Sequence, residues 1–570
     1  MEVSLNTLMS DYTSLKQSLN LSVAVDWLYE DSKDDFFPDY FMFRDILETR
    51  EDYLEQRKYR IYQVDAIPSL MEYVPKANGM LREAIWLHPT HRILYLAILH
   101  FLLPKLDKVI LPTIYSYRLD RLDDPDAYPF PNRAERWKNF QNDFRRAALD
   151  KSTNTILLTD LSSFYDHISI ECLVQRILSM LGSSVDANTE IVVEFLKQLL
   201  NLWSTTSYGI PQNFDPSSFF GSLYLHNADT EMLNNRRYQY FRWVDDIRIC
   251  AKNRDQALRS LHDLQRVLAK DRLFLASDKT KIIEKGTAAF EKLMDVEDDV
   301  IISETEEAIT RGDMDSLKKA SDITIQRLQI HSAFNGDDRK FRAYANRLLS
   351  IADFEELAEL VHPEIRKFVL PRLRSHPERS DYWTKMLAQV IDGTVLDEAK
   401  NLLTEHPSIF DWQRFYLWRM LTVSNNLLPE LLESAKTTAR LGISVLERAQ
   451  AILCIGKHGT NTEKESIFTE LFSAQMPYPI QRALIAAIQE LPEELRNRFF
   501  DRAININSDH KQFIDFITAF AQPSYGERPR AIRHCREEPR KMEVFQTSGV
   551  GLVKGARTTF RLSRSHYDYE

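Results

Sequence analysis

Three acidic residues stand where the sequence pattern ends or reverses a strand, and their side chains could bind metal ions. Asp160 directly follows the β-branched run Thr155–Thr159, which predicts a buried strand. Asp245 and Asp246 lie in the middle of residues 238–250, which predict two short strands joined by a turn. Carboxylates are the hard oxygen ligands that Mg²⁺ prefers, so neighbouring strands could present a magnesium site.

Nucleotide joining is one reaction that requires such a site. Two divalent ions, about 3.5–4 Å apart, activate the attacking oxygen and neutralise the leaving pyrophosphate. Mg²⁺ is commonly held by one or two carboxylates together with substrate phosphates. We therefore predict Asp160 and Asp245 as the main ligands of two Mg²⁺ ions, for which Mn²⁺ could substitute, and Asp246 as a third metal-binding or supporting acid. All three are predicted catalytic residues. An isolated acid at a strand end would more often be an ordinary turn or cap residue.

Three further residues stand in a definite order around these acids. Tyr165 follows Asp160 by five residues, and Gln212 belongs to a Gly-Ile-Pro-Gln turn that precedes a predicted helix. Beyond the acidic pair, the run LASDKTKII contains Lys279. The prediction of nucleotide chemistry rests on this order, because no single one of these residues is specific.

In this order the motifs resemble those of the reverse transcriptases. The resemblance spans roughly residues 80–300. Asp160 resembles the first palm motif, residues 209–212 the second, residues 244–246 the third, and Lys279 the fourth.

The resemblance implies substrate-binding roles for Tyr165, Gln212, Arg118 and Lys279. Tyr165 would be the aromatic gate that clashes with a 2′-hydroxyl and so favours deoxynucleotides; the alternative is an ordinary aromatic of the palm core. Gln212 would contact the incoming nucleotide or the template, although Asn213 replaces the glycine usual in this motif. Arg118 would hold the triphosphate through its bidentate guanidinium.

Length and composition set the wider frame. A chain of 570 residues and 66.7 kDa is too long for one hydrophobic core and predicts several domains. Only 15 Gly and 22 Pro accompany 44% hydrophobic residues, which favours a mostly helical globular protein. The four cysteines form no Cys-x-x-Cys pair, and no apolar run is long enough to span a bilayer. These features predict a cytoplasmic protein without a membrane partner. A net charge of −10 means that nucleic acid would have to bind at local basic surfaces.

The expected fold class is α+β, with a right-hand polymerase fingers-palm unit followed by an all-α, HEAT-like helical repeat domain. We predict a helical N-terminal extension, the reverse-transcriptase fingers and palm, the helical repeats, and a basic tail with ten Lys or Arg against six Asp or Glu. Their bounds are residues 1–80, 81–300, 301–525 and 526–570.

The repeat prediction rests on apolar periodicity. Residues 480–491 follow the spacing of an amphipathic helix throughout, and Pro492 can open the next helix. Aromatic residues of this region stand at helical spacing and are predicted to be core residues rather than base-stacking platforms: Trp383, Trp412, Tyr416 and Trp418. The fingers region contains a run that favours a strand, residues 109–117.

A fingers-palm unit followed by helical repeats is similar to the bacterial defence-associated reverse transcriptases, the abortive-infection group that includes AbiK and its uncharacterised relatives. That resemblance implies DNA synthesis from deoxynucleoside triphosphates during phage infection, with homo-oligomers common. Some members work without a template and prime from a protein hydroxyl, whereas others copy a companion non-coding RNA; both alternatives stay open here.

A priming hydroxyl must reach the metal ions on a flexible segment, so Tyr567 and Tyr569 in the tail are candidate primers. The tail could also bind RNA phosphates, or be a plain charged extension.

Two other functions share the sequence pattern. One is a catalytically silent RNA-binding scaffold whose helical repeats recruit partners; the retention of Asp160, Asp245, Asp246, Tyr165 and Gln212 argues against it. The other is a domesticated general reverse transcriptase without a role in defence.

Overall fold

The structure is a computed structural model, and it describes most of the chain. The described residues are 13–58, 60–64, 67–120, 124–234, 237–333, 336–520, 522–526 and 533–535.

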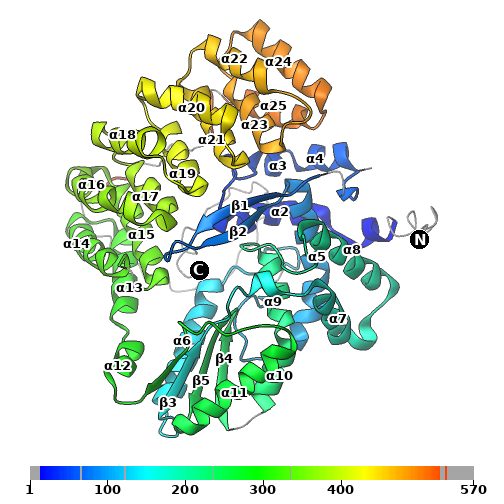
Figure 1. The fold of residues 1–570 in the computed structure, drawn as a ribbon, viewed down its shortest axis with the longest axis vertical. Helices are drawn as coiled ribbons and strands as arrows, with labels where there is room; N and C mark the ends of the chain where they lie inside the picture. The colour runs from blue at the N-terminus through cyan, green and yellow to red at the C-terminus, as the bar shows by residue number, and fades with distance from the viewer. Residues whose placement is uncertain are drawn as a thin grey trace, which may run out of the picture.

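The elements follow one another in three groups (Figure 1). The N-terminal group contains α2 (Leu21–Asp31), α3 (Arg44–Glu48), α4 (Arg50–Arg57) and the antiparallel hairpin of β1 (Leu70–Pro75) and β2 (Leu81–Trp86). The second group contains α5 (Pro89–Leu106), α6 (Arg133–Leu149), β3 (Thr155–Thr159), α7 (Ile170–Leu181), α8 (Ala187–Trp203), α9 (Asp215–Tyr224), α10 (His226–Asn234), β4 (Tyr238–Trp243), β5 (Asp246–Ala251), α11 (Arg254–Lys270), β6 (Lys281–Glu284) and α12 (Ala288–Met294).

The third group, called here the helical region, contains α13 (Glu297–Arg311), α14 (Met314–His331), α15 (Asp338–Ala352), α16 (Ala358–Ser375), α17 (Ser380–Leu387), α18 (Gly393–Lys400), α19 (Asp411–Thr422), α20 (Pro429–Leu441), α21 (Val445–His458), α22 (Asn461–Leu471), α23 (Tyr478–Ala487), α24 (Glu493–Ile506) and α25 (His510–Thr518).

The second group is built around a four-stranded antiparallel sheet in the order β4-β5-β3-β6. This confirms the strand predicted at Thr155–Thr159 and the hairpin predicted over residues 238–250. Both faces of the sheet are covered: Ile156 packs towards α6 and α12, and its neighbour Leu157 packs into the core that α7 and α11 share. Burial on both faces explains why the β3 sequence is continuously apolar rather than alternating.

Local side-chain caps begin several helices that surround the sheet. Ser169 accepts from the backbone N–H of Cys172 at 3.3 Å, and Asp186 accepts from that of Thr189 at 2.7 Å. These bonds satisfy N–H groups that have no partner within their helix, so they fix where α7 and α8 start.

The helical region curves from α13 beside the sheet to α25 beside the N-terminal helices (Figure 1). Among the described residues, no sheet strand follows β6, and the whole is a mixed but mostly helical fold. The helices predicted around residues 480–491 and after Pro492 are confirmed as α23 and α24. The four aromatic residues assigned to the core are at most 3% exposed: Trp383, Trp412, Tyr416 and Trp418.

Two sequence predictions differ from the structure. Residues 109–117 form no strand; a single bridge joins Ile114 to Arg242 at the edge of β4. Pro112 has no N–H to donate to a ladder, and Tyr117 adopts a positive φ of 49°, which together stop a regular strand. The N-terminal extension predicted as helical also contains β1, whose hairpin crosses the predicted boundary at residue 80.

The N-terminal group, called the N-terminal segment below, joins the helical region to the second group, which is called the sheet domain below. Trp412 donates its indole N–H to the carbonyl of Phe36 at 2.9 Å. Arg482 in α23 forms an ion pair at 2.6 Å with Asp45 in α3, and both side chains are almost completely buried. Breaking a buried pair by removing one partner is strongly destabilising, so this contact holds α3 firmly against α23.

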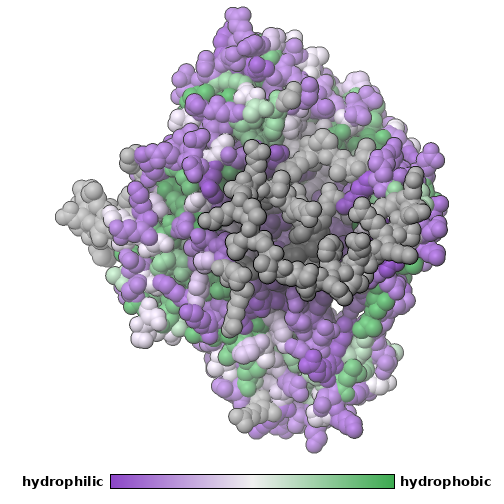
Figure 2. All heavy atoms as spheres, turned by 180° about the vertical axis from the view of Figure 1, so that it is seen from behind, coloured by the Kyte–Doolittle hydropathy of each residue, from purple (hydrophilic) through white to green (hydrophobic). Residues whose placement is uncertain are grey.

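The outer surface is dominated by hydrophilic side chains on the face seen in Figure 2, with hydrophobic residues in small scattered groups. Within the described residues, no helix combines the length and apolar character needed to cross a bilayer.

Candidate active site

The structure brings the three acidic residues together at one end of the sheet. Asp160 directly follows β3, Asp245 lies in the turn between β4 and β5, and Asp246 begins β5. The β4–β5 register pairs Trp243 with Asp246, so the turn contains only two residues. The β3–β5 register pairs Thr159 with Ile247, which brings Asp160 alongside Asp246.

The turn that presents Asp245 is strained and firmly held. Val244 has a φ of +48°, a conformation that is costly for a β-branched residue. Its N–H donates to the hydroxyl of Ser116 at 3.0 Å, and its carbonyl accepts from Arg242 at 2.7 Å. Fixing the backbone on both sides of this peptide aims the Asp245 side chain in one direction.

Arg242 is itself anchored in a buried cluster. Its guanidinium forms two hydrogen bonds to the carboxylate of Asp229 on α10, and the hydroxyl of Tyr240 donates to the same carboxylate at 2.8 Å. Arg242 is 0% exposed. We call Asp229, Tyr240 and Arg242 the support cluster, because they hold the β4–β5 turn without facing the cavities around it.

The acidic residues differ in how well their charges are compensated. Burial, and then the neighbouring charge of Asp160, raise the pKa of Asp245 to about 7. Asp160 forms an ion pair with Lys279, whose ammonium is over half exposed. Burial opposes the ionisation of Asp246, but Arg248 and Arg339 outweigh it and hold the pKa of this carboxyl below its usual range.

Asp246 is therefore engaged by protein cations rather than by the other two acids. Arg248 lies 2.9 Å and Arg339 lies 3.4 Å from the same carboxylate oxygen. No group of three or more potential metal ligands is found in the described part of the chain. Asp160 and Asp245 fit Mg²⁺ nonetheless, since two carboxylates plus substrate phosphates suffice for this ion.

Two cavities meet at Asp245. The smaller has a volume of about 170 Å³ and is lined by Tyr165, Asn213 and Ser218 among others. The larger, of about 560 Å³, is lined by all three acids, by Lys279 and by residues of α13 and α15. The described helical region therefore closes one side of the acidic cluster.

Arg339, at the start of α15, stands between the two cavities and lines both. Its guanidinium lies 3.9 Å from the centre of the Trp137 ring and pairs with Asp246, 93 residues earlier in the chain. The sequence analysis missed this residue, because nothing in its local pattern differs from that of a solvated helix-start arginine.

Tyr165 lies at the wall of the smaller cavity, on the short turn after β3. Its hydroxyl donates to Ser218 on α9 at 3.2 Å, and its ring packs against Gly221. A Cβ at Gly221 would lie only 3.1 Å from the Phe164 ring and 3.4 Å from the Tyr165 ring. Because Gly221 has no Cβ, α9 can lie close to the Tyr165 ring. This contact fixes the edge of the ring in the wall of the cavity that Asp245 also lines.

Gln212 and Asn213 occupy the turn before α9. The Gln212 amide donates to Asp166 at 3.1 Å. Asn213 has a φ of +63°, in the left-handed region that glycine favours and asparagine tolerates, which accounts for its replacement of the usual glycine. Its amide donates to the carbonyl of Asp34 at 2.7 Å, so the departure from the motif binds the N-terminal segment to the site.

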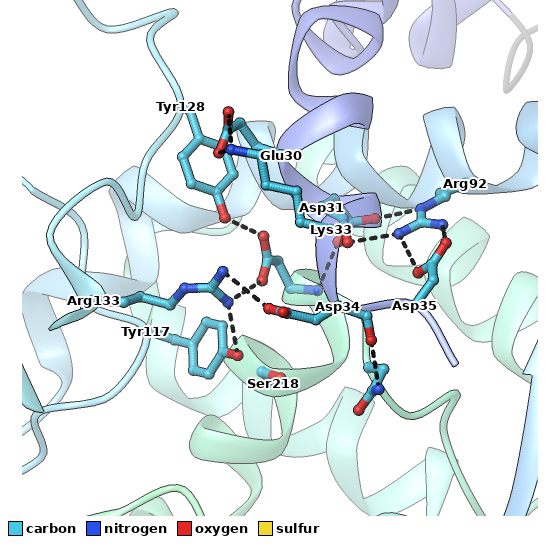
Figure 3. A network of polar contacts seen from close by, with 12 residues as sticks. Glu30, Asp31, Lys33, Asp34, Asp35, Arg92, Tyr117, Tyr128, Arg133 and Ser218 are labelled. Carbon is cyan, nitrogen blue, oxygen red and sulfur yellow. Dashed lines mark hydrogen bonds and ion pairs between the residues drawn. The ribbon is translucent and has the colours of Figure 1, made fainter. Parts of the chain in front are cut away.

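Figure 3 shows what this N-terminal segment adds. Arg133 lies within 3.3 Å of Asp34 and of the Tyr117 hydroxyl, while Arg92 pairs with Asp31 and Asp35 from the other side. The smaller cavity is thus walled by residues from the N-terminal segment, the sheet domain and the helical region together.

Comparison with known proteins assigns this unit. Residues 75–307 match the family model described as reverse transcriptase (RNA-dependent DNA polymerase). This segment is a reverse transcriptase domain. The domain supports RNA-directed DNA polymerase activity, a nucleotidyl transfer, and it contains all the acids and motif residues described above.

Solved structures similar to the chain include apo telomerase from Candida tropicalis, at 12% identity over 73% of this chain and 67% of that one, with a TM-score of 0.30. Telomerase from Candida albicans in complex with a fragment of telomeric RNA is similar at 10% identity over 83% and 68%, with a TM-score of 0.28. Such low scores carry no weight in the assignment, which rests on the family match. A search of curated proteins finds no match.

Arg118 of the reverse transcriptase domain lies elsewhere than the resemblance implies. Its guanidinium pairs with Asp107 at 2.7 Å and donates to the carbonyls of Leu111 and Ile114. It lines neither cavity around the acids. In this conformation the arginine stabilises the loop after α5.

Arg82 on β2 is the cation that sequence analysis passed over. Burial and the nearby Arg342 lower the pKa of Arg82, while the charges of Asp245 and Asp166 oppose that shift. The side chain thus lies within electrostatic reach of the acidic cluster, on the hairpin that precedes the sheet. The sequence shows several basic residues near the start of the matched segment. Nothing in it distinguishes Arg82 from the other basic residues there.

The candidate priming residues Tyr567 and Tyr569 lie outside the described residues, as does most of the basic tail.

Proposed function

We propose that the chain is a DNA polymerase that adds deoxynucleotides at Asp160 and Asp245, either copying RNA or working without a template. The observation that carries the proposal is a pair of carboxylates at the ends of adjoining strands: Asp160 pairs with Lys279, and the pKa of Asp245 is raised to about 7. Two Mg²⁺ ions held there would activate the attacking hydroxyl and neutralise the leaving pyrophosphate.

The residues around the pair divide the work. Asp246, held ionised by Arg248 and Arg339, orients the start of β5 and adds negative charge beside the metal site. Lys279 lies close enough to Asp160 to exchange that carboxylate for a substrate phosphate. Arg82 supplies a second cation for the triphosphate, in the role that the resemblance gives to Arg118.

Tyr165 serves as the sugar gate in this proposal. Its ring stands in the smaller cavity next to Asp245 and is fixed by Ser218 and by the close approach of Gly221. We expect Tyr165→Ala to raise the relative use of ribonucleotides by about 10-fold or more, because one to two kcal/mol of steric rejection is removed. Tyr165→Phe keeps the ring and should keep the selectivity; equal selectivity in all three proteins would contradict the gate. Single-nucleotide incorporation assays measure the use of ribonucleotides and of deoxynucleotides by each protein.

The helical region replaces a separate thumb in this proposal. Its helices, which we take as HEAT-like repeats, reach the acids through α15 and close the larger cavity. Gln212, bound to Asp166, would orient the nucleotide or template at the other side.

The biological setting we propose is anti-phage defence by abortive infection in the cytoplasm, by a homo-oligomer, with a companion non-coding RNA or a protein hydroxyl as template or primer. The support is the combination of a reverse transcriptase domain with a helical region, which resembles the abortive-infection enzymes. Phage challenge with and without the acidic pair separates this role from that of a general reverse transcriptase.

The decisive test purifies the chain and an Asp245→Asn variant from cells that carry its neighbouring genomic sequence. Nucleic acid that copurifies is digested with DNase, RNase or protease and sequenced. Covalent DNA of irregular sequence in the wild type alone supports protein priming without a template, whereas copies of a bound RNA support templated synthesis. The same RNA in both proteins and no DNA, even with Mg²⁺ and deoxynucleotides added, would leave only a non-catalytic scaffold. Asp255→Asn, on the exposed face of α11, is the matched control.

A further inference from the structure

A second cavity of ligand size lies away from the acids, where the N-terminal segment, the β1–β2 hairpin and the helical region meet. We call it the junction cavity. Its volume is about 400 Å³, within the range of small-molecule sites. Its walls come from described residues between Arg57 and Leu70, from Trp86, His88 and Thr90, from residues 474–479 and Gln481, and from Asn507 and Asp509. Three separate parts of the chain therefore have to be in place for it to exist.

One wall of the junction cavity is aromatic. Trp86 at the end of β2, His88 and Tyr478 at the start of α23 all line it. The His88 and Tyr478 rings lie 4.3 Å apart, and the Trp86 and Tyr478 rings lie 6.5 Å apart. Burial and the neighbouring His91 hold the pKa of His88 well below its usual value, so this ring is neutral. A flat apolar group could pack against such a wall.

Another part of the cavity lining is cationic. Arg57 and Arg60 both line it, and a single carboxylate, that of Asp509, pairs with both of them. Arg57 is only 2% exposed, yet among the described residues its Nε has no hydrogen-bond partner and its Nη2 reaches Asp509 only at 3.4 Å. A buried guanidinium with unmet donors carries a free-energy cost that an anionic acceptor in the cavity would remove.

From these features we propose that the junction cavity binds a nucleoside phosphate, with the base against Trp86 and Tyr478 and the phosphate on Arg57 and Arg60. An aromatic slot with an arginine pair at one end matches the two chemically different halves of such a ligand. The ligand can come from two sources, a free mononucleotide or the end of an oligonucleotide, which present the same groups.

Binding there bears on the active site through β2. Trp86 in the junction cavity and Arg82 near the acids lie four residues apart on this strand, and residues at even separations share one face of a strand. Glu72 on β1 also accepts from the backbone of Leu446 in α21 at 3.3 Å. A ligand between the hairpin and α23 would therefore fix the position of Arg82. This last consequence rests on the proposed polymerase function; the binding itself does not.

The test measures binding to the full-length Asp160→Asn/Asp245→Asn variant in EDTA by isothermal titration calorimetry, so that the acids and divalent ions play no part. The probes are AMP, dAMP, adenosine, inorganic phosphate and a 5′-phosphorylated dinucleotide. We expect one saturable AMP site per chain. Adenosine and phosphate, each carrying one half of the ligand, should bind at least tenfold more weakly.

Two substitutions place the ligand. Arg60→Ala, at a half-exposed arginine in the turn after α4, should weaken AMP binding at least tenfold, whereas Arg50→Ala at the start of α4, whose side chain pairs with Asp26, should not change it. Trp86→Leu should weaken AMP binding without affecting inorganic phosphate. Melting temperatures check that each variant is folded.

The outcomes separate the alternatives. Binding of the dinucleotide but not of AMP would assign the site to oligonucleotide ends, and the reverse to free nucleotides; both retain the site. No saturable binding of any probe to the folded protein, or equal AMP affinity in Arg60→Ala and Arg50→Ala, would overturn it. Failure to find polymerase activity would not overturn the binding site, because these experiments measure binding and not catalysis.

Discussion

The reverse transcriptase domain contains carboxylates in two different settings. One is Asp229 in the support cluster, and the other is the pair of Asp160 and Asp245. In the support cluster, the carboxylate of Asp229 is satisfied by the guanidinium of Arg242 and the hydroxyl of Tyr240. In the pair that we propose to be catalytic, half-buried Asp245 lies next to Asp160 and has its pKa raised to about 7. The charge of Asp229 is paired within the protein. Asp245 has a strongly shifted pKa, which is typical of acids at sites where a ligand binds.

The sharpest way to break this comparison is Asp245→Asn. Incorporation of deoxynucleotides should fall by about 1,000-fold or more, because one of two metal-binding carboxylates is lost. The melting temperature should stay the same or rise, since an acid repelled by Asp160 becomes a neutral isostere. Incorporation assays and thermal unfolding of the same preparation check both parts. A lower melting temperature would mean that Asp245 is a structural residue.

Asp229→Asn tests the opposite half. It leaves Arg242 buried without its carboxylate and should destabilise the domain by about 3–5 kcal/mol. Urea unfolding measures this loss. Activity per folded molecule should change much less than in Asp245→Asn, and a comparable loss of activity in well-folded protein would place Asp229 in the chemistry. Asp263→Asn, a surface residue of α11, is the control.

Arg339 joins the helical region to the acidic residues, because it lies on α15 and pairs with Asp246. Arg339→Ala should reduce kcat by about tenfold with little effect on stability, since the pair is partly exposed. If the arginine positions Asp246, the Mg²⁺ concentration needed for half-maximal activity should change in Arg339→Ala. Arg339→Lys should then restore part of the lost activity. Arg366→Ala, which removes a distant pair with Asp392, controls for general effects on the helical region. An unchanged Mg²⁺ dependence would reduce Arg339 to a packing residue.

The smallest expected effect concerns pH. Burial, and then Arg482 and Arg57, lower the pKa of His510 from 6.5 to about 4. Because the unfolded chain takes up this proton more readily, stability is present above pH 6.5 and is lost as the pH falls towards 4. His510→Gln should reduce the fall in melting temperature between pH 7 and pH 5 by about 2 °C. An unchanged slope would mean that His510 is not responsible.

Local sequence patterns were enough to predict three strands of the sheet, β3, β4 and β5, and to single out the acids at their ends, but they did not predict β6. The three central residues of β3, Ile156–Leu158, are all apolar because both faces of the strand are covered, and the hairpin over residues 238–250 contains its acids at the turn. These are short-range patterns, in which strand period and turn position can be counted along the chain.

Long-range placements could not be predicted in this way. Arg118 pairs with Asp107, whereas Arg82 lies within electrostatic reach of Asp245, and nothing in the residues around either arginine indicates this difference. Asn213 departs from its motif for a reason that lies in the N-terminal segment, where it bonds Asp34.

The sequence by itself therefore determined the reaction class: carboxylates at strand ends, an aromatic residue five positions on and a glutamine turn leave few alternatives to nucleotidyl transfer. Only the tertiary structure decided that Asp246 turns towards two arginines, that α15 supplies one of them, and that three parts of the chain enclose the junction cavity. The physical reason is one of range. Strand and turn preferences act over a few residues, whereas burial and ion pairing depend on neighbours that the fold brings together from hundreds of residues away.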